Sequence, residues 1–188
     1  ETNKIIKEKG EEAALECEVY NLDPKLLAIL GRLYFRSSYS QNVLNHSIEM
    51  SHLAGMIAEE LGANVATAKA GALLHDIGKA LDHEVSGTHV EIGRKILQKF
   101  NVSEDVIKAM QAHHGEYPYE TIESVIVQTA DAISGAALVR VEIRSSTISS
   151  ALRSWRPSLF PLMVLRKPML YKLGGRFVSL SRRTKFLT

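Results

Sequence analysis

The sequence predicts an all-α fold, and three observations carry this prediction. Apolar residues recur at helical spacing in consecutive segments of residues 1–135. Capping residues and glycines stand at the ends of those segments, and no alternating pattern typical of a strand competes with them. With 188 residues, 45% of them hydrophobic, the chain is long enough to bury one ordinary globular core.

The predicted helices follow one another along the chain. Asp23 before Pro24 is typical of a helix start, because proline is favoured at the first helical position. A second helix is predicted from Gln41 to Leu61, where Gly62 supplies a stop. The other predicted helices cover residues 66–77, 89–100, 103–113 and about 120–133. The third of these begins at Ser103, and the second follows a capping box in which Glu91 stands three residues after Thr88.

Composition excludes several classes of protein. No apolar run approaches the roughly 20 residues that cross a bilayer, and no signal peptide opens the chain. The single cysteine, Cys17, excludes a disulfide framework and a cysteine-rich zinc site, and we expect it to be a buried apolar residue. These features predict a cytoplasmic protein.

Charge divides the chain into two pieces. Residues 1–131 hold 12 Lys+Arg and 20 Asp+Glu, whereas residues 132–188 hold 11 Lys+Arg and the single acid Glu142. All seven histidines lie between His46 and His114. Two compositionally different pieces therefore meet near residue 136.

Polar residues inside the apolar stretches indicate a metal site. His75 and Asp76 stand side by side at the end of an apolar helix, while His46 and Asp131 lie within two other predicted helices. A buried ionised aspartate is costly unless a cation or hydrogen-bond donors compensate it, and a metal is the simplest compensation. Two imidazoles and two carboxylates suit Mn, Fe, Ni or Zn better than Ca.

The order His46, His75-Asp76, Asp131 resembles the H…HD…D signature of the HD superfamily of metal-dependent phosphohydrolases. The surrounding sequence is similar to the HD domain of the ribonuclease Y family over roughly residues 5–136. The motifs that carry this resemblance are residues 31–47, 70–80, 82–85, 89–93 and 113–115. The resemblance implies an HD-domain helical bundle with a metal site between helices, and endonucleolytic cleavage of RNA by metal-activated water.

The resemblance also implies roles for individual residues. The core metal ligands are His46, His75, Asp76 and Asp131. Candidate ligands of a second ion are His89, His113 and His114. Lys79, beside Asp76 in the catalytic set, would steady a phosphate oxygen or the charge on a leaving oxygen. We expect one or two divalent transition-metal ions (Mn, Fe, Ni or Zn, with Mg as an alternative).

Each role has a plainer alternative. Lys79 could be a solvated lysine at a helix end, and His89 could be the residue that merely follows an N-cap. One of His113 and His114 could only orient its neighbour. The remaining two histidines, His52 and His83, are interpreted as ordinary core or surface residues.

The resemblance predicts three parts: a linker helix region over residues 1–20, an HD domain over 21–136, and a basic atypical tail over 137–188. The family also has a membrane anchor, a long coiled coil and a KH domain, which this sequence does not contain. We therefore interpret the chain as the catalytic part of a longer protein or as a stand-alone relative.

The tail departs from the family pattern after residue 136, and we hypothesise a reading-frame change there. Starting the codons of residues 169–174 one base earlier can spell Ala-x-Gln-Ala-Gly, which resembles the family's C-terminal stretch. The alternative is a divergent basic tail. If the frame changed, the tail contributes no metal ligand or catalytic group and packs more loosely than residues 20–135.

Three functions remain open at this point. The first is phosphodiester hydrolysis of RNA, and the second is hydrolysis of small or cyclic nucleotides by the same ligands. The third is a non-catalytic module in which the metal only ties helices together. The expected partners are accordingly RNA or a nucleotide, together with a second copy of the chain as a homodimer.

Overall fold

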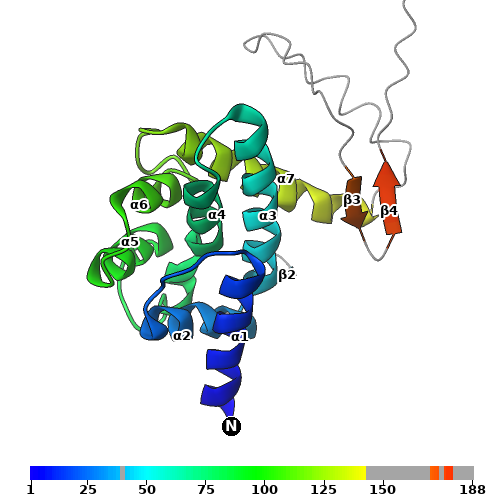
Figure 1. Ribbon diagram of the computed structural model, residues 1–188. Helices are drawn as coiled ribbons and strands as arrows, with labels where there is room; N and C mark the ends of the chain where they lie inside the picture. The colour runs from blue at the N-terminus through cyan, green and yellow to red at the C-terminus, as the bar shows by residue number, and fades with distance from the viewer. Residues whose placement is uncertain (39–40, 143–169, 174–175, 180–188) are drawn as a thin grey trace, which may run out of the picture. The chain divides into compact units, whose positions relative to one another are not determined.

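The computed structural model describes residues 1–38, 41–142, 170–173 and 176–179, and the chain divides into two compact units, Glu1–Arg144 and Ser145–Thr188. The first unit confirms the all-α prediction (Figure 1). Its helices are α1 (Thr2–Glu16), α2 (Pro24–Arg32), α3 (Val43–Leu61), α4 (Val65–Leu74), α5 (His89–Lys99), α6 (Glu104–Gln111) and α7 (Ile122–Glu142). No described helix combines the length and the apolar character needed to cross a bilayer.

Short elements that the sequence pattern did not reveal connect these helices. Two 3-10 turns, η1 (Leu33–Phe35) and η2 (Ile77–Ala80), follow α2 and α4. Between η1 and α3, the strand β1 (Ser37–Ser38) pairs antiparallel with β2 (Gln41–Asn42). Strands of two residues are too short to show a period in the sequence.

The second unit contains one described antiparallel pair. Strand β3 (Leu170–Leu173) pairs with β4 (Arg176–Ser179), with Leu170 opposite Ser179. The other residues of the tail lie outside the described part of the chain, so the expectation that the tail packs loosely stays a prediction.

Three of the predicted helix ends are capped as expected, whereas Ser103 precedes α6 without a side-chain cap hydrogen bond. Pro24 is the first residue of α2, and the Asp23 side chain accepts a hydrogen bond from the backbone N–H of Lys25. Thr88 caps α5 by accepting from the N–H of Glu91. Gly62 ends α3 in the left-handed conformation, with a φ of 68°.

Two predicted helices end earlier than the apolar pattern indicates. Helix α4 stops at Leu74, so that His75 and Asp76 lie in a break before η2, and α6 stops at Gln111. The His75 ring bonds to the carbonyl of Ala72, which in a continuing helix would accept the N–H of Asp76. In the same way, the His113 ring after α6 bonds to the carbonyl of Met110. Each of the two helices therefore ends where a histidine ring, instead of a backbone N–H, donates to a carbonyl of the last turn.

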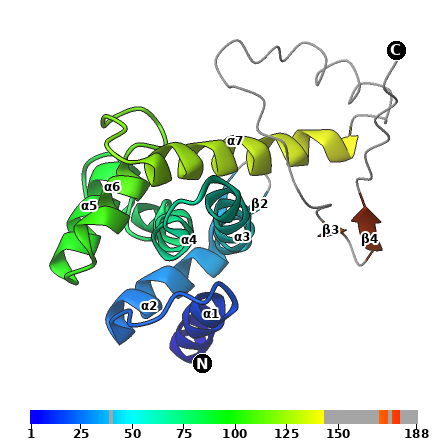
Figure 2. The same ribbon diagram turned by 45° about the horizontal axis from the view of Figure 1, so that its top comes forward.

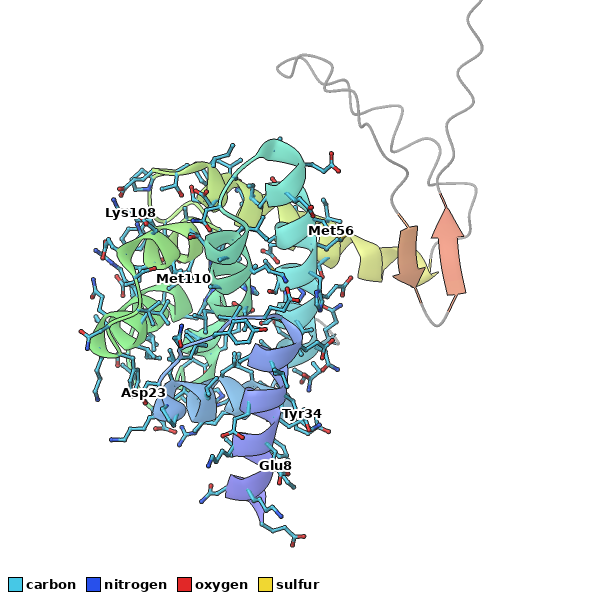
Figure 3. The ribbon with its side chains drawn as sticks, in the orientation of Figure 1. Glu8, Asp23, Tyr34, Met56, Lys108 and Met110 are labelled. Atoms are coloured by element: carbon cyan, nitrogen blue, oxygen red, sulfur yellow. The ribbon has the colours of Figure 1, made fainter. Side chains whose placement is uncertain are left out.

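The core of the first unit lies on both sides of α4. On one side, large apolar residues of α2, α4, α5 and α6 pack together, including Met110 in the interior (Figure 3). On the other side, α7 runs across α3 and α4 (Figure 2). Small residues allow this close approach, and they are Ala54, Ala58, Ala68, Ala72, Ala109 and Ala130. The packing holds the ends of α4 and α6 near the first turn of α3 and the middle of α7.

Helix α1 is packed tightly against α2. A Cβ atom on Gly10 would lie 1.9 Å from the carbonyl oxygen of Leu27, so the two backbones touch. Cys17, which follows α1, is fully buried in the core, as the sequence predicts. The predicted linker region thus contributes to the packing of the first unit, while its limits at residues 1–20 and 21–136 stay a prediction.

Candidate metal centre

The structure brings the seven histidine and aspartate residues predicted as ligands to one place, where five helices meet. They come from the first turn of α3, from the middle of α7, from the break after α4, from the first residue of α5 and from the turn after α6. The residues are His46, His75, Asp76, His89, His113, His114 and Asp131. Their side chains form two adjacent groups with Asp76 between them.

The first group, called here the mixed group, consists of His46, His75 and Asp131, whose ligand atoms all lie within 4.8 Å of one another. Nε2 of His46 is 3.3 Å from Oδ1 of Asp131. The other ring nitrogen of His46, Nδ1, is 3.0 Å from the hydroxyl oxygen of the buried Ser134. A partner on the second nitrogen is typical of metal-binding histidines, because it fixes the ring orientation.

His75 and Asp76 form the buried floor of the centre, with side chains only 2% exposed. Nδ1 of His75 donates to the carbonyl of Ala72 at 2.8 Å, so the neutral ring directs the lone pair of Nε2 toward Oδ2 of Asp76, 3.2 Å away. Two lone pairs at this distance require a cation between or beside them, either a proton or a metal.

The pKa directions at this floor agree with that requirement. Burial opposes charging of His75, but the Asp76 carboxylate outweighs it and raises the pKa of the imidazole. Burial likewise favours the neutral acid at Asp76, yet His75 and Lys79 hold the pKa of this carboxyl well below its usual range. Asp76 is therefore an anion in the interior, which needs positive charge nearby.

The second group, called here the histidine group, consists of His89, His113 and His114. His113 is buried, and its Nδ1 donates to the carbonyl of Met110 at 2.6 Å. Burial, with His75 alongside, lowers the pKa of His113 to about 3. Burial also lowers the pKa of His89. Both rings are thus neutral near pH 7 and present a lone pair, while the exposed His114 opens this group to solvent.

Asp76 connects the two groups. Its Oδ1 lies 3.6 Å from Nε2 of His89, and it forms a third possible ligand set with His75 and His113. Oδ2 accepts a hydrogen bond of 2.6 Å from Nζ of Lys79. Asp76 is therefore placed to face ions held by either group.

The unpaired atoms of the centre fit a divalent ion. Among the described residues, three buried atoms at this place have no hydrogen-bond partner, namely Oδ1 of Asp76 and Nε2 of His89 and His113. A buried polar atom without a partner costs free energy, and a metal ion removes this cost. Neutral imidazoles with carboxylates are ligands that suit divalent transition metals.

Two residues that support the centre, Ser134 and Gly78, were not identified from the sequence. Ser134 orients His46, and its position three residues after Asp131 on one helix was an available signal. Gly78 allows η2 to touch the start of α5, because a Cβ atom there would lie 1.9 Å from the carbonyl oxygen of His89. The two histidines set aside are not part of the cluster: His52 is partly exposed beside Glu16, and His83 is 74% exposed beside Asp82.

Helices packed around a buried cluster of histidines and aspartates define a helical protein with a candidate metal centre. The HD domain family model matches residues 43–136, a range that includes all seven residues of the cluster. The chain belongs to the HD domain family.

Curated relatives include ribonuclease Y of Alkaliphilus metalliredigens, 52% identical over 153 residues, which cover 81% of this chain and 32% of that protein. Ribonuclease Y of Finegoldia magna is 54% identical over 136 residues, or 72% of this chain and 26% of that protein. The chain thus spans about a quarter to a third of the length of these relatives.

The fold is also similar to a crystal structure described as a predicted HD superfamily hydrolase from an uncultured Thermotogales bacterium. The TM-score is 0.51 at 19% identity, and the match covers 69% of this chain and 88% of that one. At this level of identity the likeness shows the shared helical fold.

Proposed function

We propose that this chain hydrolyses phosphodiester bonds in RNA with the help of divalent metal ions. The observation that carries the proposal is the set of buried nitrogen and oxygen atoms around Asp76, among which Oδ1 of Asp76 and Nε2 of His89 and His113 have no hydrogen-bond partner. The identity above 50% to proteins named ribonuclease Y supports RNA as the substrate.

The proposed ligands divide between two ions. His46, His75, Asp76 and Asp131 would hold one ion, and His89, His113 and His114, with Asp76 between, would hold the other. When bound, such ions polarise a phosphoryl oxygen and lower the pKa of water, and the ligand chemistry favours Mn, Fe, Ni or Zn.

The chain's own groups prepare the centre for this chemistry. The carbonyls of Ala72 and Met110 fix the tautomers of His75 and His113, so that both rings turn Nε2 inward. The ammonium group of Lys79 has three N–H donors, and one of them donates to Asp76. The other two can donate to a phosphate oxygen. Because His114 is exposed and Asp76 is buried, we expect the substrate to approach from the histidine group.

The test is hydrolysis by the full chain in the presence of Mn²⁺, Ni²⁺, Zn²⁺ or Mg²⁺. The substrates are a 5′-monophosphorylated single-stranded RNA, the DNA of the same sequence and a panel of mono- and cyclic nucleotides. We expect internal cleavage of the RNA, which stops when a chelator is added. An Asp76→Asn variant serves as a control, because it keeps the shape of the side chain but removes its charge.

Two results would replace this proposal by the alternatives. Hydrolysis of the nucleotides with intact RNA would identify a small-nucleotide enzyme. Bound metal without hydrolysis of any substrate would identify a non-catalytic module in which the ion only connects helices.

We also propose that the catalytic part ends near residue 136, where the family match ends. A chain cut after Ala136 should keep its metal content and its hydrolysis, because all the proposed ligands precede the cut. A shortened chain that folds but loses its metal would place a ligand in the tail. The nucleotide sequence tests the frame-change hypothesis directly, since an adjacent frame that does not encode a charged helix would refute it.

A further inference from the structure

We propose that Arg36 binds a phosphate of the substrate that flanks the bond to be cleaved, in a pocket beside the metal centre. The identity of the substrate rests on the proposed function. The position of the arginine rests on the structure itself.

The pocket has a volume of about 570 Å³ and adjoins the centre, because Lys79 and His89 are part of its wall. This volume is in the range of pockets that hold small ligands, and it is sufficient for a nucleotide. Another part of the lining comes from the segment after η1, where Arg36 stands. One pocket is therefore lined both by Lys79, the partner of the buried Asp76, and by an arginine from a different part of the chain.

The backbone fixes the place of Arg36 relative to the centre. Arg36 has an extended conformation after η1, and its carbonyl accepts a hydrogen bond of 3.0 Å from the N–H of Val43. Val43 begins α3, the helix that carries His46 one turn later. The start of one helix therefore positions both a proposed metal ligand and the arginine.

The side chain of Arg36 is only weakly engaged. Its Nη2 atom lies 3.7 Å from Oδ1 of Asp82, which is too long for a hydrogen bond, and both side chains are partly exposed. An ion pair of this kind contributes little to stability. A phosphate would offer the guanidinium two short, charge-assisted hydrogen bonds in its place, and arginine is well suited to that geometry.

The pocket also contains two acidic residues, Asp82 and Glu116, which do not prevent Arg36 from binding a phosphate. Asp82 lies 3.7 Å from both Arg36 and the exposed His83, and the Glu116 carboxylate accepts a hydrogen bond of 2.8 Å from the hydroxyl of Thr88. Lys79 is held by Asp76 at the inner end of the pocket. A strand of RNA carries phosphates on both sides of each internal bond, so a phosphate bound near Lys79 has a neighbour that an outer cation can hold.

Arg32 provides a matched control. Its Nη1 lies 3.1 Å from Oε1 of Glu84, on the same loop that carries Asp82, and its side chain is 43% exposed, against 29% for Arg36. However, Arg32 lines a different pocket, of about 350 Å³, together with residues of α1 and α2. Removing either arginine changes the net charge equally, but only Arg36 faces the metal centre's pocket.

The first experiment measures binding without activity. Fluorescence anisotropy follows a labelled single-stranded RNA octamer bound to the metal-free full chain over a series of salt concentrations. We expect R36Q to bind about tenfold more weakly, the value of a charged hydrogen bond. The salt slope should fall by about 0.7, which corresponds to one lost phosphate contact. R32Q should bind like the wild type, and the basic tail contributes equally in every variant.

The second experiment uses the metal-loaded chain and compares two substrates. Bis(p-nitrophenyl) phosphate has no flanking phosphate, whereas an RNA trinucleotide has one. We expect R36Q to lose about tenfold more kcat/KM on the trinucleotide than on the small diester, mainly through KM, and R36K to recover part of the loss.

The results separate the two proposals. Wild-type affinity in R36Q, or an equal loss in R32Q, overturns the role of Arg36, as does a wild-type chain that binds no RNA. An R36Q-specific loss of binding in a chain that hydrolyses no RNA supports the role of Arg36 and refutes the proposed function.

Discussion

The two halves of the candidate metal centre use different means to prepare ligands. In the mixed group, carboxylates face imidazoles, and the Asp76 carboxylate raises the pKa of His75. In the histidine group, burial lowers the pKa of His113 and His89, so these rings are neutral without any carboxylate of their own. The support also differs, because a side chain, Ser134, orients His46, whereas a backbone carbonyl orients His113.

This comparison shows that negative charge distinguishes the halves more than ligand number does. The carboxylates at the mixed group attract a cation by their negative charge. A metal ion bound there therefore replaces the proton that would otherwise lie between an imidazole and a carboxylate. The histidine group offers only lone pairs, and its nearest negative charge is Oδ1 of Asp76, 3.6 Å from His89. We therefore expect the mixed group to bind its ion more tightly, and the histidine group to depend on Asp76.

The largest expected effect comes from Asp76→Ala, because Asp76 is the proposed ligand that the two groups share. Without this carboxylate the histidine group faces no anion and the mixed group keeps only Asp131, so both ions should be lost. RNA hydrolysis should fall by more than about 100-fold, the upper value seen for changes outside the ligand set. Metal analysis after gel filtration measures the loss, and circular dichroism checks that the helices remain. Two ions retained in this variant would contradict the central role of Asp76.

A smaller and more selective effect is expected from removing one histidine at a time. His46→Ala should lose the ion of the mixed group, and His114→Ala should lose only that of the histidine group. Metal content per chain, determined by mass spectrometry, distinguishes one ion from two. His52→Ala is the control, because this histidine is partly exposed beside Glu16 and belongs to none of the possible ligand groups. Equal loss of both ions in either ligand variant would mean that the groups do not act separately.

Gly78→Ala should disturb the histidine group through the backbone. The new Cβ atom would meet the carbonyl oxygen of His89, so the start of α5 has to move. We expect a loss of about 1–3 kcal/mol in the free energy of unfolding, as is usual for overpacking, and weaker binding in the histidine group. Gly135→Ala is the control, because a Cβ atom on this helical glycine meets no atom within 4 Å. Urea titration and metal titration measure the two effects.

The smallest effect is expected from Ser134→Ala, which removes the partner of His46. The affinity of the mixed group should fall about tenfold, at the lower end for an orienting residue, while the histidine group keeps its affinity. Thr129→Ala removes a hydroxyl from the same helix, but that hydroxyl bonds to the carbonyl of Val125 on α7 itself. Competition with a coloured chelator reports the affinities. A matching loss in the Thr129 variant would attribute the effect to α7 as a whole.

The fold could be predicted because its helices depend on local signals. The cap at Asp23, the stop at Gly62 and the capping box at Thr88 are each encoded within a few residues. The break at His75 could not be predicted, because it depends on a ring that bonds to a carbonyl instead of the next amide.

For the centre, the sequence indicated which residue types could bind a metal, because histidine and aspartate are rare inside apolar helices. The supporting contacts depend on distances across the fold. Gly78 resembles any helix-ending glycine until α5 is seen against it, and Arg36 resembles any surface arginine until the pocket is known. The roles of the ligands themselves stay predictions until an ion is measured.

The endings of α4 and α6 have a consequence for the electric field at the centre. Both helices end beside the cluster, so their C-terminal dipoles place partial negative charge there, whereas α5 begins at His89 and α3 begins one turn before His46, so these two helices place partial positive charge beside it. The ends of α4 and α6 thus favour a cation at the centre, and the starts of α3 and α5 favour an anion beside it. Each helix end contributes roughly 0.3–1 kcal/mol, and no ligand substitution removes that contribution. Variants that lack single ligands should therefore keep both contributions, because these are encoded in the direction of the helices.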